Sequence, residues 1–361
     1  MCATQPDAGS PASSPDAPPP DAPSRRGTYR WQREVPPGWR DLLAGGKRAK
    51  RWRRYWIADV VDGLGDIAGS GLMRLGPVEA VSNLGGRLGR RAGAKVHLHG
   101  TEVARTALRH LRPDLPREAE DAWLAGMWEN IGRTFAETAL LSRIHDQGRL
   151  QGGAAEHFQQ ALKDGVPAIA LFAHVGNWEL AYGWLPRHGV PLSFAYQPPD
   201  NRFRHWVIKR TRQRQGAEIL PPDLRSLRPL LDRLRAGRAV GFAVDEAIED
   251  YCYGPAFGRP LDPAGNIAVV QVLAHLAGAR IIPGYCLRRP GVRFDVEIGA
   301  PLIDFSRNRP DRLTRAHIAE GAAVINAHFE PVIHANLQQW FMLHQFGIRE
   351  GEAPRFTPPA A

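Results

Sequence analysis

The sequence predicts an α/β fold, a mixed central sheet flanked by helices, with an amphipathic helical region on its N-terminal side. From residue 168 onward, short apolar runs alternate with segments of helical periodicity, a pattern typical of α/β proteins. The runs that indicate strands are 168–173, 192–196, 217–220, 239–244 and 280–287. With 361 residues and 43% apolar content, the chain can bury a full core within one large domain.

Composition divides the chain into four parts. Residues 1–24 are rich in Pro, Ala, Ser and Asp and show no periodicity, so we expect a disordered tail. Residues 25–54 form a basic segment, and residues 55–350 carry the patterning of a folded domain. Residues 351–361 are expected to be a flexible tail.

The basic segment carries most of the chain's formal net charge of +10: it holds eleven Lys and Arg residues against Glu34 and Asp41. Between residues 47 and 56 the cations are interleaved with aromatic residues, which suits an anionic membrane surface, where each cation contributes on the order of 1 kcal/mol. Nucleic-acid binding and a merely solvated basic tail are the alternatives.

The segment that follows has the periodicity of an amphipathic helix, with Trp56, Val60 and Leu64 on one face and aspartates on the other. Three aspartates make it a poor transmembrane span, and the sequence has neither a long uncharged apolar run nor a signal peptide. We therefore expect a protein lying on the cytoplasmic face of a membrane. The alternative is that this helix packs on the protein's own core.

The sequence shows only weak signals for a nucleotide site, a disulfide framework or a metal site. The glycines of residues 63–69 resemble a loosened dinucleotide fingerprint, but they fall within the amphipathic helix rather than after a strand. Cys2, Cys252 and Cys286 form neither a disulfide framework nor a CxxC motif, so they indicate a reducing compartment. No His or Cys spacing is typical of a metal site.

His174 is the strongest candidate for chemistry. It follows the apolar run 168–173, and Glu179 comes five residues later. On one helix the two side chains would diverge by roughly 140°, so the pair needs a break between them, which residues 175–177 supply through a glycine and a potential capping Asn. The pattern predicts strand, turn and helix, with Glu179 hydrogen-bonded to His174 and the imidazole acting as a general base.

The spacing itself is not specific. About one His-x4-acid match is expected by chance in this composition, and the chain contains two, His97/Glu102 and His174/Glu179. Only the second follows an apolar strand of that length. A hydrogen-bonded structural histidine is the alternative interpretation of His174. Asp245 ends another predicted strand, and the carboxyl ends of strands are where such sheets place their sites.

Several ordered blocks resemble one family. The segment His174-Val-Gly-Asn-Trp-Glu179 is similar to the His-x4-acid motif of the lysophospholipid acyltransferase superfamily, and its ending is most similar to the late acyltransferases of lipid A biosynthesis. The resemblance runs from about Trp52 to Arg349. Its other blocks are residues 107–116, Asn201 with 212–216, 234–245 with 257–260, and 330–340.

The resemblance implies an acyltransferase domain over residues 55–350, with His174 as the base and Glu179 orienting it. It implies substrate-binding roles for Asn177, Arg212, Asp245, Gly258 and Arg259. The donor would be a thioester of acyl carrier protein or coenzyme A, with no cofactor and no metal. The acceptor would be a lipid A precursor or a related glycolipid at the bacterial inner membrane, and no nucleic-acid partner is expected.

The sequence departs from the family pattern at several positions, so the resemblance does not fix the identity of the acceptor. His110 replaces the usual Asn of the N-terminal block, and an Asp-striped helix replaces the family's transmembrane helix. Another glycolipid or a lysolipid is therefore an alternative acceptor. An alternative of a different class is a basic membrane- or RNA-binding protein that keeps an inactive acyltransferase-like domain.

Overall fold

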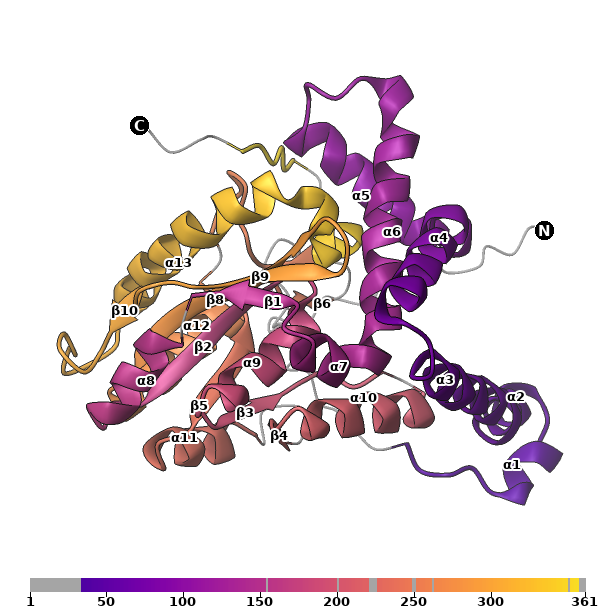
Figure 1. The fold of residues 1–361 in the computed structure, drawn as a ribbon, viewed down its shortest axis with the longest axis horizontal. Helices are drawn as coiled ribbons and strands as arrows, with labels where there is room; N and C mark the ends of the chain where they lie inside the picture. The colour runs from indigo at the N-terminus through magenta and orange to yellow at the C-terminus, as the bar shows by residue number, and fades with distance from the viewer. Residues whose placement is uncertain are drawn as a thin grey trace, which may run out of the picture.

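The computed structural model of the chain describes residues 34–153, 155–199, 201–220, 226–248, 251–261, 263–349 and 351–356. The expected disordered tail, the first part of the basic segment and residues 357–361 lie outside these ranges. The described part confirms the predicted fold class, because a mixed sheet lies at the centre with helices around it (Figure 1).

The main sheet has eight strands. Its path is β1-β9-β8-β2-β5-β3-β4, and β10 pairs with β8. Strands β2, β5, β3 and β4 are mutually parallel, β8 joins β2 in parallel, and β8 and β9 run antiparallel. The strands are β1 (Leu150–Gly152), β2 (Ala168–Gly176), β3 (Leu192–Ala195), β4 (Glu218–Leu220), β5 (Ala239–Ala243), β8 (Arg280–Arg289), β9 (Arg293–Ile298) and β10 (Ile303–Asp304), with β6 (Ala247–Ile248) and β7 (Tyr251–Cys252) forming a separate pair.

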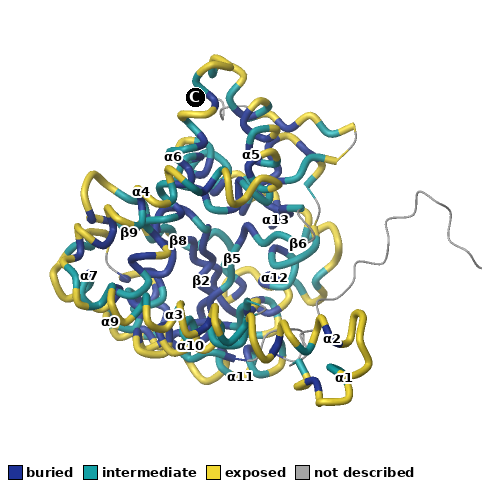
Figure 2. Tube along the Cα trace, turned by 90° about the vertical axis from the view of Figure 1, so that its right-hand side faces the viewer, coloured by how far each residue is buried: buried dark blue, intermediate teal, exposed yellow. Residues whose placement is uncertain are grey.

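Strand β2 is buried on both faces, which explains its continuous apolar sequence. Ile169, Leu171 and Ala173 belong to the core cluster on one face of the sheet, and Ala170 and Phe172 belong to the cluster on the other. Helices α12 and α13 contribute to the first cluster and α8 and α9 to the second. Figure 2 shows the central strands as the buried centre of the molecule. The helices of this part are α8 (Glu156–Lys163), α9 (Ala181–Arg187), α10 (Arg202–Arg214), α11 (Leu227–Arg235), α12 (Asn266–Ala277) and α13 (Arg315–Ala335).

A helical region precedes the sheet, as predicted. Its helices are α1 (Trp39–Leu43), α2 (Gly46–Arg53), α3 (Asp59–Met73), α4 (Val78–Val96), α5 (Leu98–Leu111), α6 (Glu120–Glu137) and α7 (Leu141–Asp146). Helices α4 and α6 pack with their backbones nearly in contact. A Cβ atom on Gly89 would lie 2.1 Å from the carbonyl oxygen of Trp128, and one on Gly132 would lie 2.3 Å from that of Gly85. Only glycine fits at these positions.

Helix α3 attaches to α10 through its polar side. Arg204 forms an ion pair with Asp66 at 2.9 Å, Asn201 donates to the backbone carbonyl of Asp59 at 3.0 Å, and Phe203 occupies the space that a side chain on Gly63 would need. Asp59, Gly63 and Asp66 lie on one face of the helix, so α10 covers the face that the sequence marks as polar.

The apolar face of α3 points outward as a result. Val61 is 64% exposed and Leu64 57% exposed, and Ile57 and Ile67 are exposed beside them. The alternative that this helix packs on the protein's own core is thus true of its polar side, which contacts α10, and not of its apolar face. Residues 63–69 are helical throughout and follow no strand, so they do not form a dinucleotide-binding turn. None of the helices in the described ranges has the length and apolar character needed to cross a membrane.

Candidate active site

The site is built at the carboxyl ends of two neighbouring parallel strands. β2 and β5 pair in the register Phe172 with Ala243, and the backbone N–H of Val244 donates to the carbonyl of Phe172 at 2.7 Å. His174 lies two residues after Phe172, and Asp245 lies two residues after Ala243. The parallel register thus brings the two side chains together although 71 residues separate them in sequence.

Asp245 holds the imidazole at two points. Its Oδ1 lies 2.8 Å from Nδ1 of His174, and its Oδ2 accepts the backbone N–H of the same residue at 2.8 Å. A carboxylate only accepts hydrogen bonds, so Nδ1 carries the hydrogen and Nε2 is left as the basic nitrogen. Asp245 is completely buried, whereas the His174 side chain keeps 22% exposure. The described residues provide no hydrogen-bond partner for Nε2.

Aromatic side chains complete this arrangement. Nε1 of the buried Trp340 donates to Oδ2 of Asp245 at 2.8 Å, which fixes the carboxylate from a third direction. The His174 ring lies edge-to-face with Trp178 at 5.3 Å between centroids, and Phe341 packs against both rings. These rings form an apolar wall beside an imidazole that remains partly exposed.

Glu179 contacts a different residue from the one we expected. The predicted hydrogen bond to His174 is absent: Glu179 is buried and receives two hydrogen bonds from Arg212, Nε to Oε2 at 2.9 Å and Nη2 to Oε1 at 2.5 Å. Strand β2 extends through Gly176, so His174 lies inside the strand rather than at its end. The turn at Gly176 and the 3-10 turn Trp178–Leu180 then carry Glu179 toward α10.

Arg212 forms a buried ion pair with Glu179. Burial lowers the pKa of Arg212, but the Glu179 carboxylate more than offsets this, so the pKa lies above its usual value. The guanidinium lies over the rings of Tyr196 at 4.5 Å and Tyr182 at 4.8 Å. Its Nη1 is buried and has no hydrogen-bond partner. The predicted substrate contact of Arg212 stays a prediction, with Nη1 as the donor it has available.

Replacing Glu179 by glutamine should destabilise the fold. The change leaves the buried Arg212 charge uncompensated, so we expect the free energy of unfolding to fall by about 3–5 kcal/mol in chemical denaturation. Glu102→Gln is the matched control, because Glu102 occupies the same position in the other His-x4-acid segment but pairs with Arg105 at the surface. There we expect a loss below about 1 kcal/mol. Equal losses would contradict a structural role for the Glu179–Arg212 pair.

Asn177 is held by a buried network that the sequence did not suggest. It is completely buried and does not cap the following turn with its side chain. Its Nδ2 donates to Oε2 of Glu137 at 2.7 Å, and Arg288 binds the same carboxylate through Nη1 at 2.6 Å and Nη2 at 2.8 Å. Thr134 donates to the carbonyl of Gly176 at 3.0 Å. Helix α6 therefore supports the turn that follows His174. These residues lie far apart in sequence and match no motif.

Gly258 and Arg259 lie in the loop after β7, near the C-terminal segment. The Arg259 guanidinium donates to the backbone carbonyls of Ala256, Cys252 and Pro255 and stacks over Phe346 at 3.9 Å. Gly258 has a φ of +75° and approaches the backbone of Arg355. Both residues thus have evident structural roles, and their predicted substrate contacts stay predictions.

The site offers an imidazole base but no activated thiol. Burial raises the pKa of Cys286 to about 12, and burial together with Asp245 raises the pKa of Cys252 well above its usual value. Thiols of this kind are poor nucleophiles, because the thiolate is the reactive form. Among the described residues, no group of His, Cys, Asp and Glu side chains has the arrangement of a metal site.

The fold and the site together indicate the class of protein to which the chain belongs. An imidazole oriented by a buried carboxylate, at the carboxyl edge of a mixed α/β sheet, is an arrangement that general-base enzymes use. Comparison with known proteins identifies the enzyme family. The model of the family described as bacterial lipid A biosynthesis acyltransferase matches residues 44–346. The chain belongs to this family, and it is an acyltransferase.

Similar proteins of known function are acyltransferases as well. The chain is 27% identical to the phosphatidylinositol mannoside acyltransferase of Mycobacterium tuberculosis over 246 residues, which are 63% of this chain and 74% of the relative. It is 26% identical to the lipid A biosynthesis acyltransferase of Haemophilus influenzae over 219 residues, 59% of this chain and 67% of the relative. The phosphatidylinositol mannoside acyltransferase of Mycolicibacterium smegmatis is 26% identical over 64% of this chain and 77% of its own length.

Proposed function

We propose that the enzyme transfers a fatty acyl group from a thioester of acyl carrier protein or coenzyme A to a hydroxyl group of a lipid A precursor or related glycolipid, with His174 as the general base. The observation that carries this proposal is the contact between Nδ1 of His174 and Oδ1 of Asp245 at 2.8 Å, which leaves Nε2 basic at the partly exposed side of the ring.

The chemistry follows from that tautomer. Nε2 takes the proton of the acceptor hydroxyl while its oxygen attacks the carbonyl carbon of the thioester. The imidazolium that forms is stabilised by the Asp245 carboxylate, as in other acid–histidine pairs. Collapse of the tetrahedral intermediate breaks the carbon–sulfur bond, and the departing thiolate takes the proton back from Nε2. The ester and the free thiol are the products, and His174 returns to its starting state.

Direct transfer requires donor and acceptor to be bound together. The buried, high-pKa thiols of Cys252 and Cys286 support this scheme, because a covalent acyl-enzyme needs an activated nucleophile. We expect intersecting double-reciprocal plots when acyl thioester and acceptor are varied, with full activity in chelator. Parallel lines, or an acyl adduct on the intact protein after incubation with donor alone, would contradict direct transfer.

The acceptor class rests on the relatives. Their names refer to lipid A and to phosphatidylinositol mannoside, both of which are lipids that carry sugars. Mass spectrometry of lipid A and total lipids from a deletion strain tests this assignment. Loss of one acyl chain from a glycolipid, restored by the wild-type gene and not by a His174→Ala variant, is the expected result. Accumulation of a lysolipid with loss of its acylated product, and no change in glycolipids, would favour the alternative acceptor.

We further propose that the enzyme lies peripherally on the cytoplasmic face of the inner membrane, with the outward face of α3 in the lipid surface. Ile57, Val61, Leu64 and Ile67 form this face, and Lys47, Lys50 and Arg53 lie on the neighbouring helix α2. In that segment Glu34 pairs with Arg51 and Arg54, and Asp41 pairs with Arg48. Exposed apolar side chains beside cations are what an interfacial helix presents to anionic lipid.

A further inference from the structure

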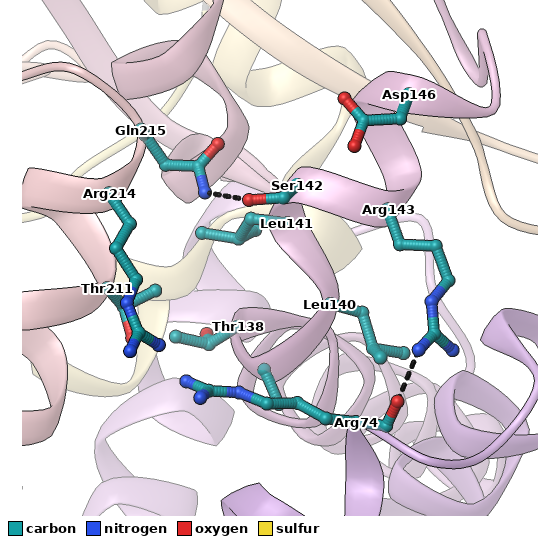
Figure 3. Close-up of a pocket in the computed structure, with 11 residues that line it drawn as sticks. Arg74, Thr138, Leu140, Leu141, Ser142, Arg143, Asp146, Thr211, Arg214 and Gln215 are labelled. Atoms are coloured by element: carbon teal, nitrogen blue, oxygen red, sulfur yellow. Dashed lines mark hydrogen bonds between the residues drawn. The ribbon is translucent and has the colours of Figure 1, made fainter.

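Three arginines converge beside the apolar face of α3. Arg74 follows the end of α3, and Arg210 and Arg214 belong to the last turns of α10. They line two adjoining hollows of about 180 and 380 Å³, and Arg74 and Arg214 line both. Figure 3 shows the Arg74 and Arg214 side chains extending toward the same side of the larger hollow.

These cations have no counter-charge within the described part of the chain. No carboxylate there lies within ion-pair distance of the three guanidinium groups. Asp146 lines the larger hollow, but Figure 3 places it on the opposite side, and it pairs with Arg187 at 3.7 Å. Burial lowers the pKa of Arg74, and the positive charges of Arg214 and Arg210 lower it further. Like charges held together without a carboxylate favour an anion between them.

The smaller hollow has apolar side chains beside its arginines. Ile67 and Trp206 line it together with Arg74, Arg210 and Arg214, and Ile67 continues the outward face formed by Val61 and Leu64. Trp206 is exposed and stacks near Arg210 at 5.6 Å. A ligand at this place would meet guanidinium groups on one side and exposed apolar side chains on the other.

We propose that Arg74, Arg210 and Arg214 bind the phosphate of an anionic glycerophospholipid whose acyl chains lie in the membrane beneath the outward face of α3. Guanidinium groups match the geometry of phosphate oxygens and bind them in pairs. The site rests on the proposed membrane attachment, because α3 must reach the lipid surface for a headgroup to enter.

The shape of the site favours a lipid over an acidic protein. A hollow of about 180 Å³ admits a phosphate group, whereas a docked helix, with a diameter of roughly 10–12 Å, would need a much longer groove. The apolar face of α3 continues past the hollow for several turns, which suits acyl chains. An acidic carrier protein at the same arginines is the competing occupant that the experiment must reject.

The test compares two charge-matched variants of the full chain. R74Q/R210Q/R214Q removes the cluster, and R307Q/R309Q/R312Q removes three exposed arginines from the loop after β10, on the far side of the molecule from α3 in Figure 1. Binding is measured to vesicles of phosphatidylcholine alone and of phosphatidylcholine with phosphatidylglycerol in roughly equal parts, at physiological salt. Circular dichroism checks that both variants are folded.

We expect the cluster variant to lose about a hundredfold in affinity for the phosphatidylglycerol vesicles, since each cation at an anionic surface strengthens binding by roughly fivefold. Distant charges are screened beyond about 8 Å, so the control should stay within about twofold of wild type. Binding to phosphatidylcholine alone should not change. R74K/R210K/R214K, which keeps the charge but not the paired donors, should bind between wild type and the cluster variant.

Two results would overturn the phosphate site. Equal losses in the cluster variant and the control would assign the effect to net charge. A raised KM for the carrier-protein thioester in the cluster variant, with vesicle binding unchanged, would assign the arginines to the carrier protein. The variant V61D/L64D separates the premise from the proposal: if it binds both vesicle types like wild type, α3 is not the membrane face and the attachment itself is wrong.

Discussion

Replacement of His174 by alanine is expected to lower kcat/KM for acyl transfer by about 10²- to 10⁴-fold while leaving the fold intact. The imidazole is the proposed base, and its Nε2 has no hydrogen-bond partner among the described residues. Its loss removes one hydrogen bond, that of Nδ1 to Oδ1 of Asp245, while the backbone N–H of residue 174 and Trp340 continue to hold Oδ2. Initial-rate kinetics and a thermal melt of the same preparation measure the two expectations separately.

His97→Ala is the control for this experiment. His97 belongs to the second His-x4-acid segment, but it is exposed at the start of α5 and stacks on Trp128 at 5.0 Å instead of binding a carboxylate. We expect its activity to stay within about threefold of wild type. Near-wild-type transfer by His174→Ala would contradict the assignment of the base.

Asp245→Asn is expected to cost about 10²- to 10⁴-fold in kcat with little change in structure. Oδ2 of Asp245 accepts from two N–H donors, the His174 backbone and Trp340. An asparagine must therefore place its carbonyl oxygen there and turn its amide NH₂ toward Nδ1. Nδ1 then has to accept, the ring hydrogen moves to Nε2, and the nitrogen that faces the acceptor can no longer take a proton.

Glu246→Gln provides the neighbouring control. Glu246 accepts the backbone N–H of Asn266 at 2.9 Å, a contact that a glutamine oxygen can keep. The NMR signal of the His174 ring nitrogens would report the tautomer in each variant. If Asp245→Asn kept its activity while Glu179→Gln lost it without unfolding, the carboxylate that matters would be Glu179 and the proposed orientation of His174 would be wrong.

The sequence predicted best those elements whose position depends on the burial of their own side chains. The apolar runs placed β2, β3, β4, β5 and β8 close to their observed bounds, because each strand is fixed by burial of its own side chains. The helical region predicted on the N-terminal side of the sheet comprises helices α1 to α7 in the structure.

The pairing of charged groups was harder to predict. The sequence placed both His174 and Asp245 at carboxyl ends of strands, but it assigned Glu179 to His174 because it lies only five residues away. The actual partner depends on the register of β2 with β5, which the sequence does not state. Glu179 instead meets Arg212 from α10, and Glu137 meets Arg288 from β8. Such contacts arise only when distant elements pack.

The register that joins His174 to Asp245 also bears on how substrate preference can diverge in this scaffold. Both residues follow the last pair of one hydrogen-bonded ladder by two positions, so sliding β2 relative to β5 would break several backbone bonds at once. The segments around the edge of the sheet can therefore vary in length or sequence without moving His174 and Asp245. We therefore expect engineered exchanges of peripheral loops to retain acyl transfer while altering which lipid is acylated.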